Sequence, residues 1–201
     1  IFFPIYFGSI FYQDNAKRAK ILNQSSDMNA YLMSLDMEIS FTPFDATGRA
    51  RIAQLINKSN QFNLTTKRYS EVEIEEFMLN KTHDVFSVSV MDKFGDNGLT
   101  AVIITCKNAN EVTVDSFIMS CRIMGRNIEK ALMDYIINEY ELQSFLKVKG
   151  AYFATAKNKP VLNFYEDSHF TIISAATTEK QYELSVKDYQ SHNINYIDIN
   201  K

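Results

Sequence analysis

The chain has little cysteine, no cluster of basic residues and no apolar run long enough to cross a membrane. Its two cysteines, Cys106 and Cys121, lie in different sequence contexts, so they suggest no disulfide framework and favour a reduced, cytoplasmic setting. The formal net charge of -3, without a run of Lys or Arg, argues against a nucleic-acid-binding protein. The three histidines are far apart and no Cys/His spacing supports zinc, which argues against a metal site; no Ser-His-Asp set can be assembled either.

The N-terminal residues 1–12 are very apolar, but they are shorter than the roughly 20 residues that span a bilayer. They lack the basic lead-in and the cleavage pattern of a signal peptide, so we expect no membrane segment. We expect them to pack on their own domain or on a neighbour, as part of a longer protein. We therefore assign 1–36 to an apolar segment and linker helices from a preceding domain, and 37–201 to a single domain.

Apolar periodicity predicts a mixed α/β (α+β) order of elements. The expected strands are 37–44, 85–91, 99–106, 111–120, 148–156, 170–175 and 181–186. The expected helices are 45–57, 71–79, 126–142 and 160–167, with a capping box from Ser70 to Glu73 and a hairpin turn at 95–98. A central mixed, mostly antiparallel sheet with helices on both faces satisfies this order.

The most informative motif is the turn between strand 111–120 and helix 126–142. Its residues are Cys121, Arg122, Ile123, Met124, Gly125, Arg126 and Asn127. The first N–H groups of a helix lack partners and carry the positive end of its dipole, so they bind phosphate. Arg122 and Arg126 are candidate phosphate clamps, or surface arginines that pair with Glu129. Gly125 suits close approach of a ligand to the backbone, or a plain helix start.

Two residues, Cys121 in this turn and Tyr165 further along the chain, could perform acyl chemistry. Cys121 is a candidate acyl-thioester nucleophile, because a helix N-terminus and guanidinium charges lower the pKa of a thiol. The alternative is a buried cysteine that packs as a small apolar side chain, the role we expect for Cys106. Tyr165 is either a general acid or a core phenol with a bonded hydroxyl.

A dense polar cluster lies between the helices predicted at 45–57 and 71–79. Its members are Asn60, Gln61, Asn63, Thr65 and Thr66. Amides and hydroxyls suit recognition of a small polyol, although the same residues also favour ordinary loop capping. Lys157 and Asn158 follow the end of strand 148–156, which we expect to face the same cleft as this polar cluster. They are candidates for contact with the substrate or the carrier arm.

The order of elements, with an Arg-x-x-Gly-x-Asn turn before the main helix, resembles the GNAT N-acyltransferase fold. The family pattern there is Gln/Arg-x-x-Gly-x-Gly/Ala, whose amides hold the pyrophosphate of acyl-CoA. Arg122 and Gly125 match this pattern, whereas Asn127 departs from the small last residue. The run NFYEDSHF at 163–170 is similar to the GNAT ending, and Tyr165 matches the tyrosine that often protonates the thiolate leaving group. The resemblance implies CoA or phosphopantetheine at residues 122–127.

A narrower resemblance rests on four motifs between residues 15 and 175. They are QLINKSNQFNLTTKRY at 54–69, DKFGDNG at 92–98, MSCRIMGR at 119–126 and TAKN at 155–158. Together they resemble the C-terminal part of FkbH-like proteins, which load a glyceryl thioester onto an acyl carrier protein in methoxymalonyl-type secondary metabolism. The resemblance implies an HAD-type phosphatase domain before this chain. The Asp-x-Asp nucleophile motif of that domain is absent here, so we expect no phosphatase activity.

Three functions remain open from the sequence. In the first, a phosphopantetheine arm of CoA or an acyl carrier protein enters a V-shaped opening between strands 112–120 and 148–156 and exchanges its acyl group with Cys121. In the second, the chain is an acetyl-CoA-dependent N-acetyltransferase, although no acidic residue is clearly placed as its base. In the third, it is a non-catalytic docking module for a carrier protein or a phosphatase domain.

Overall fold

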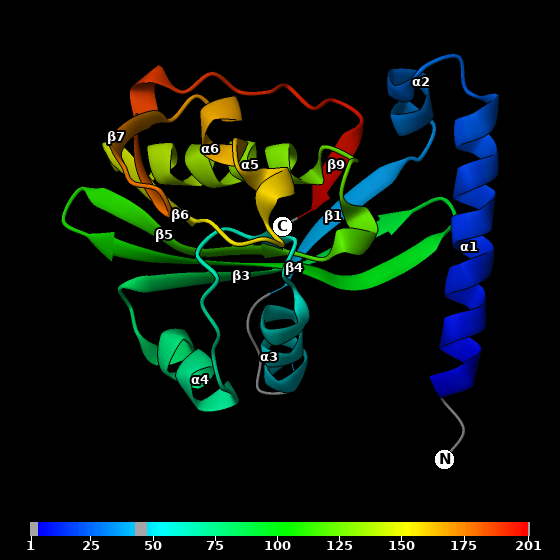
Figure 1. Cartoon of the computed structure of the whole chain (residues 1–201), viewed down its shortest axis with the longest axis horizontal. Coiled ribbons are helices and arrows are strands. Elements are labelled where there is room, and N and C mark those ends of the chain that lie inside the picture. Colours follow the sequence, from blue (N-terminus) through cyan, green and yellow to red (C-terminus); the bar gives the residue numbers. More distant parts are fainter. Residues whose placement is uncertain (1–3, 43–47, 201) are drawn as a thin grey trace.

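The computed structural model describes residues 4–42 and 48–200, and Figure 1 shows its layers. The helices are α1 (Pro4–Gln24), α2 (Met28–Met33), α3 (Arg49–Lys58), α4 (Glu71–Leu79), α5 (Ile128–Leu142) and α6 (Phe164–Asp167). The strands are β1 (Met37–Thr42), β2 (Phe62–Asn63), β3 (His83–Asp92), β4 (Gly95–Asn108), β5 (Glu111–Met119), β6 (Lys147–Phe153), β7 (Thr171–Ala175), β8 (Glu179–Ser185) and β9 (Ile197–Asn200). Short 3-10 turns cover Cys121–Ile123 (η1), Lys159–Val161 (η2) and Val186–Asp188 (η3).

One mixed sheet organises these elements, in the order β7-β8-β6-β5-β4-β3-β1-β9. The pairs β5/β6 and β1/β9 are parallel, and the other neighbouring pairs along this order are antiparallel. Figure 1 shows α5 and α6 over one face and α3 and α4 over the other. The predicted fold class, a mostly antiparallel mixed sheet with helices on both faces, is confirmed.

Local sequence signals explain several elements directly. The Ser70 hydroxyl accepts from the Glu73 N–H, and the Glu73 carboxylate accepts from the Ser70 N–H, which starts α4 with the predicted capping box. Helix α5 buries a regular apolar stripe that includes Ile128, Leu132 and Ile136 against the sheet. Burial of this stripe fixes α5, and with it the turn that precedes it.

The hairpin turn predicted at 95–98 is wrong. Asp92 pairs with Gly95, so the turn consists of Lys93 and Phe94, and β4 begins at Gly95. The Asp92 carboxylate accepts from the Phe94 N–H, and the Asn97 amide donates to the Val90 carbonyl across the strands. These contacts hold the Asn-Gly pair inside the sheet, despite its preference for turns.

Segment 160–167 divides into η2 and α6, and β2 and β9 were not predicted. The helix start expected near Asp45 and the first three residues lie outside the described residues. Tyr31, Leu32 and Leu35 belong to the same apolar core as β3 to β6, so the chain before residue 37 packs onto the sheet. None of the described helices is long and apolar enough to cross a membrane.

Candidate functional site

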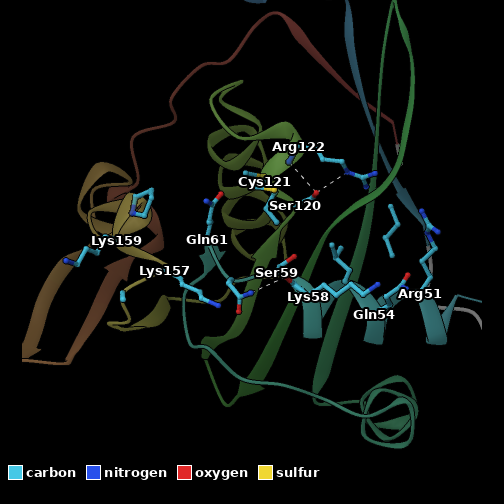
Figure 2. A pocket seen from close by; sticks show the side chains of 16 residues that line it. Arg51, Gln54, Lys58, Ser59, Gln61, Ser120, Cys121, Arg122, Lys157 and Lys159 are labelled. Atoms are coloured by element: carbon cyan, nitrogen blue, oxygen red, sulfur yellow. Dashed lines mark hydrogen bonds between the residues drawn. The ribbon is translucent and has the colours of Figure 1, made fainter. Parts of the chain in front are cut away.

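A cavity of about 980 Å³ opens at the carboxyl end of β5 (Figure 2). Four segments form its wall: helix α3 with the loop after it, β4 through Leu99, the end of β5 with η1, and the loop after β6 with η2. The lining residues are Arg51, Gln54, Leu55, Lys58, Ser59, Asn60, Gln61, Leu99, Met119, Ser120, Cys121, Arg122, Ala156, Lys157, Lys159 and Pro160. Its volume is in the range of pockets that hold small molecules and cofactors.

The cavity is strongly basic. Five of its lining residues are cations, namely Arg51, Lys58, Arg122, Lys157 and Lys159, and none of the described lining residues is acidic. Burial, and next the positive charge of Arg51, lower the pKa of the Arg122 guanidinium. Because cations face one another here without a described carboxylate between them, the cavity favours an anionic ligand.

Helix α3 supplies one side of the cavity through its spacing. Arg51, Gln54, Leu55 and Lys58 follow the i, i+3, i+4, i+7 pattern and therefore share one face. The opposite face, with Ile52, Ala53 and Ile56, is buried against the sheet. The cavity role of these residues was not predicted, although the same periodicity that indicates the buried face of α3 also indicates its polar face.

Two of the residues predicted from the turn, Cys121 and Arg122, reach the cavity. Ser120 follows β5 and caps η1, where its hydroxyl accepts from the Arg122 N–H at 3.4 Å and from the Arg122 Nε at 3.2 Å. The Arg122 Nη2 donates to the Asn97 carbonyl at 3.4 Å. Cys121 is exposed, so its thiol is accessible on the wall beside this cation.

The rest of the predicted anion-binding turn does not line the cavity. Ile123 is fully buried in the core. Gly125 is exposed with φ +77°, and the space beside its Cα is open. Asn127 has the left-handed φ of 59° before α5, and its amide donates to the Tyr196 hydroxyl at 2.6 Å. None of these three residues is among those that line the cavity with Cys121 and Arg122.

Arg126 is buried and engaged inside the protein. Its Nη1 donates to Asp92 at 3.0 Å and its Nη2 donates to the Arg122 carbonyl at 3.1 Å. Burial, followed by the charge of Arg18, lowers the pKa of Arg126. The structure thus contradicts both roles expected for Arg126, a phosphate clamp and a surface partner of Glu129.

The V-shaped opening expected between the parallel strands is filled. Strands β5 and β6 pair only over Glu111–Thr113 and Lys147–Lys149, and beyond this point they diverge. Strand β2 pairs antiparallel with the end of β5, through Phe62 with Met119 and Asn63 with Ile118. The expected entry of a phosphopantetheine arm between the strands is therefore corrected, because the chain itself occupies that position.

The predicted polar cluster divides between the cavity and the sheet. Asn60, Gln61 and Lys157 line the cavity. Asn63 and Asn158 are fully buried and Thr65 is nearly so. The Asn63 side chain bonds to backbone groups of residues 66 and 67, and Thr65 donates to the Asp115 carbonyl. Asn63, Thr65 and Asn158 hold the loop rather than substrate, and Thr66 lies outside the cavity lining.

Tyr165 lies away from the cavity, packed against Gly150 of β6, with 1% of its surface exposed. Burial, and then the neighbouring Tyr182, raise the pKa of the Tyr165 phenol. A phenol in this position is part of the core, which contradicts its expected role as the acid that protonates a leaving group.

Among the described residues, no group of three or more His, Cys, Asp or Glu could hold a metal ion.

No protein-family model matches the chain, and no curated protein matches its sequence. Solved structures do share its fold. The ribosomal-protein-S18-alanine N-acetyltransferase from Escherichia coli superposes with a TM-score of 0.58 and 14% identity, over 74% of this chain and 94% of that chain.

Two neighbours were solved with coenzyme A. The spermidine N-acetyltransferase from Vibrio cholerae, in complex with CoA and spermine, has a TM-score of 0.58 and 12% identity, over 74% of this chain and 96% of that chain. The PaiA N-acetyltransferase from Thermoplasma acidophilum, in complex with coenzyme A, has a TM-score of 0.55 and 13% identity, over 73% of this chain and 98% of that chain. The chain has the GNAT N-acetyltransferase fold.

Proposed function

We propose that the chain is an acyltransferase that takes its acyl group from a phosphopantetheine thioester of the CoA type. The observation that carries this proposal is the basic cavity at the end of β5, with five cations and no described acidic side chain in its wall. Phosphate oxygens bind strongly to guanidinium and ammonium groups, and Arg122 together with Lys157 and Lys159 would hold them. The CoA complexes of structurally similar acetyltransferases support the same donor class.

The fold neighbours favour direct transfer to an amine. In that reaction the neutral amine nitrogen attacks the thioester carbonyl carbon, the C–S bond breaks, the amine loses a proton, and the leaving thiolate gains one. A polycation such as the spermine of the Vibrio cholerae neighbour would be repelled by Arg51, Lys58 and Arg122. We therefore expect an acceptor that carries few positive charges or is itself acidic.

A second candidate is covalent transfer through Cys121, favoured by its exposed position on the cavity wall. The Cys121 thiol would lose its proton, its sulfur would attack the donor carbonyl carbon, the C–S bond of the donor would break, and the leaving thiolate would gain a proton. The thiol of a second phosphopantetheine would then lose its proton and attack the Cys121 thioester, which frees the Cys121 thiolate to be protonated again. The FkbH-like motifs support a glyceryl-type acyl group, an acyl carrier protein as partner and a preceding HAD-type phosphatase domain.

Calorimetric titration with acetyl-CoA tests the donor class. We expect saturable binding that weakens by about 10- to 160-fold in Arg122→Ala and in Lys157→Met, as loss of a charge-assisted contact costs roughly 1.5–3 kcal/mol. Lys187→Met, at an exposed residue of η3, is the matched control and should bind as the unaltered chain does. No binding, or equal binding by all variants, would contradict the proposal and favour the non-catalytic docking module.

Intact mass after incubation with an acyl-CoA separates the two routes. An adduct of one acyl group that persists in Cys106→Ser and disappears in Cys121→Ser establishes the covalent route. Turnover of an amine that Cys121→Ser leaves unchanged establishes direct transfer.

A further inference from the structure

Segment Phe62–Thr65 bridges the two diverging strands of the sheet. Strand β4 covers one edge of β5 along its length, from Ala101 beside Met119 to Asn108 beside Glu111. The opposite edge of β5 pairs with β6 only at its start, so its second half would be open. The bridging segment lies along that open half.

On the β5 side, the contacts are those of an added strand. Phe62 and Asn63 pair with Met119 and Ile118, and the Leu64 N–H donates to the Phe117 carbonyl at 3.4 Å. The Thr65 hydroxyl donates to the Asp115 carbonyl at 2.9 Å. The edge of β5 from residue 115 to residue 119 is therefore covered.

On the β6 side, the segment is held by Phe153 and Asn158. The Phe153 N–H donates to the Leu64 carbonyl at 2.8 Å, and the Asn158 amide donates to the Asn63 carbonyl at 3.0 Å. The Asn158 amide also donates to the Phe153 carbonyl, while its oxygen accepts from Thr155 and Tyr152. Asn158 thereby ties the end of β6 to the bridging segment.

The burial of this segment distinguishes a permanent strand from a movable lid. Leu64 is 0% exposed and Phe62 is 2% exposed, and the Phe62 ring packs on Phe117 and Phe164. Displacing the segment would expose both apolar side chains and remove the Asn63 carbonyl to which the buried Asn158 amide donates. A bound tether would have to replace all of these contacts to take the same position.

We infer that segment Phe62–Thr65 is a fixed part of the sheet and that a phosphopantetheine donor binds wholly in the basic cavity, beside α3, instead of along β5 between β5 and β6. This inference rests on the proposed function. It assigns the donor's contacts to Arg122, Lys157 and the α3 face, and places its reactive end within reach of Cys121. The backbone of β5 before Met119 would then make no contact with the donor.

Amide hydrogen exchange with and without saturating CoA tests this assignment on the full chain. We expect the amides of Leu64 and Phe153 to keep their protection, while exchange slows in 119–123 and 156–160. Faster exchange at Leu64 and Phe153 on CoA binding would show that the segment leaves its place, and would overturn the inference while the proposed function stands. Absence of CoA binding in calorimetry would overturn both.

A disulfide lock provides a second readout. Asn63 and Ile118 are paired across β2 and β5 and neither lines the cavity, so we would introduce Asn63→Cys with Ile118→Cys in a Cys106→Ser, Cys121→Ser background. The oxidised and reduced forms of this one variant serve as each other's control. Equal affinity for CoA in both forms supports a fixed segment, whereas binding only after reduction overturns it. Should the variant not fold, hydrogen exchange of the unaltered chain decides the question alone.

Discussion

The Nη1 of Arg126 lies 3.0 Å from Oδ2 of Asp92, and both side chains are buried. Arg18 of α1 donates to the same carboxylate from Nε and Nη2, each at 2.9 Å. Asp92 thus joins the N-terminal helix to the turn that follows β5, and Arg126 continues the connection to the carbonyl of Arg122. The position of the cavity's Arg122 therefore depends on residues that do not touch the cavity.

Removal of Asp92 tests the importance of this cluster. Asp92→Ala leaves two buried guanidinium groups without their carboxylate, so we expect the free energy of unfolding to fall by about 3–5 kcal/mol. Urea denaturation measures the change. Asp188→Ala, at an exposed residue of η3, is the control and should stay within about 0.5 kcal/mol. A loss below about 1 kcal/mol in Asp92→Ala would contradict the assignment.

The same carboxylate predicts a pH dependence of stability. Burial alone would raise the pKa of Asp92, but hydrogen bonds from Arg18 and Phe94 and the charges of Arg18 and Arg126 outweigh it, so its pKa lies below 3.8. A carboxylate with a lowered pKa contributes stability that is complete above the unfolded value and is lost as pH falls through the folded value. The free energy of unfolding, measured from pH 6 to pH 3, should fall more steeply in the unaltered chain than in Asp92→Asn. Parallel plots of this free energy against pH for the two proteins would contradict the prediction.

Asn158 is predicted to be a structural residue. Asn158→Ala leaves the Asn63 and Phe153 carbonyls without a donor in a buried region, which we expect to destabilise the fold by about 1–3 kcal/mol. Asn163→Ala is the matched control, because Asn163 is exposed and its side chain does not cap α6. If both variants unfold at the same urea concentration, Asn158 does not anchor β2.

Gly150 and Tyr165 should couple in a double-mutant cycle. A Cβ at residue 150 would overlap the Tyr165 ring, so Gly150→Ala is expected to cost about 1–3 kcal/mol of stability. Tyr165→Leu removes the overlapping ring, and in that background the cost of Gly150→Ala should shrink. The free energies of unfolding of the two single variants and the double variant give the coupling. Simple additivity would contradict the packing described here.

Elements held by contacts between residues close in the sequence were mostly predicted, whereas elements held by contacts between distant residues were mostly missed. The α4 capping box and the α5 apolar stripe depend on residues three or four apart, and both were predicted. Strand β2 depends on a partner far along the chain, since Phe62 pairs with Met119, and it was missed. The turn at 93–94 is an exception: it was missed although local contacts hold it, from the Phe94 N–H to Asp92 and from the Asn97 amide to Val90. Cys121 and Arg122 were found because they adjoin a strand end, whereas Arg126, next to them, turned inward to a distant carboxylate.

Alkylation of Cys121 in the presence of CoA tests the central claim, a phosphopantetheine donor in the basic cavity, most directly. Peptide mass spectrometry would follow iodoacetamide labelling of Cys121 and, as an internal control, Cys106. At CoA about ten times above its Kd, labelling of Cys121 should slow about tenfold, since only the unbound protein reacts, and labelling of Cys106 should not change. An unchanged labelling rate at Cys121, with CoA shown to be bound, would contradict the account.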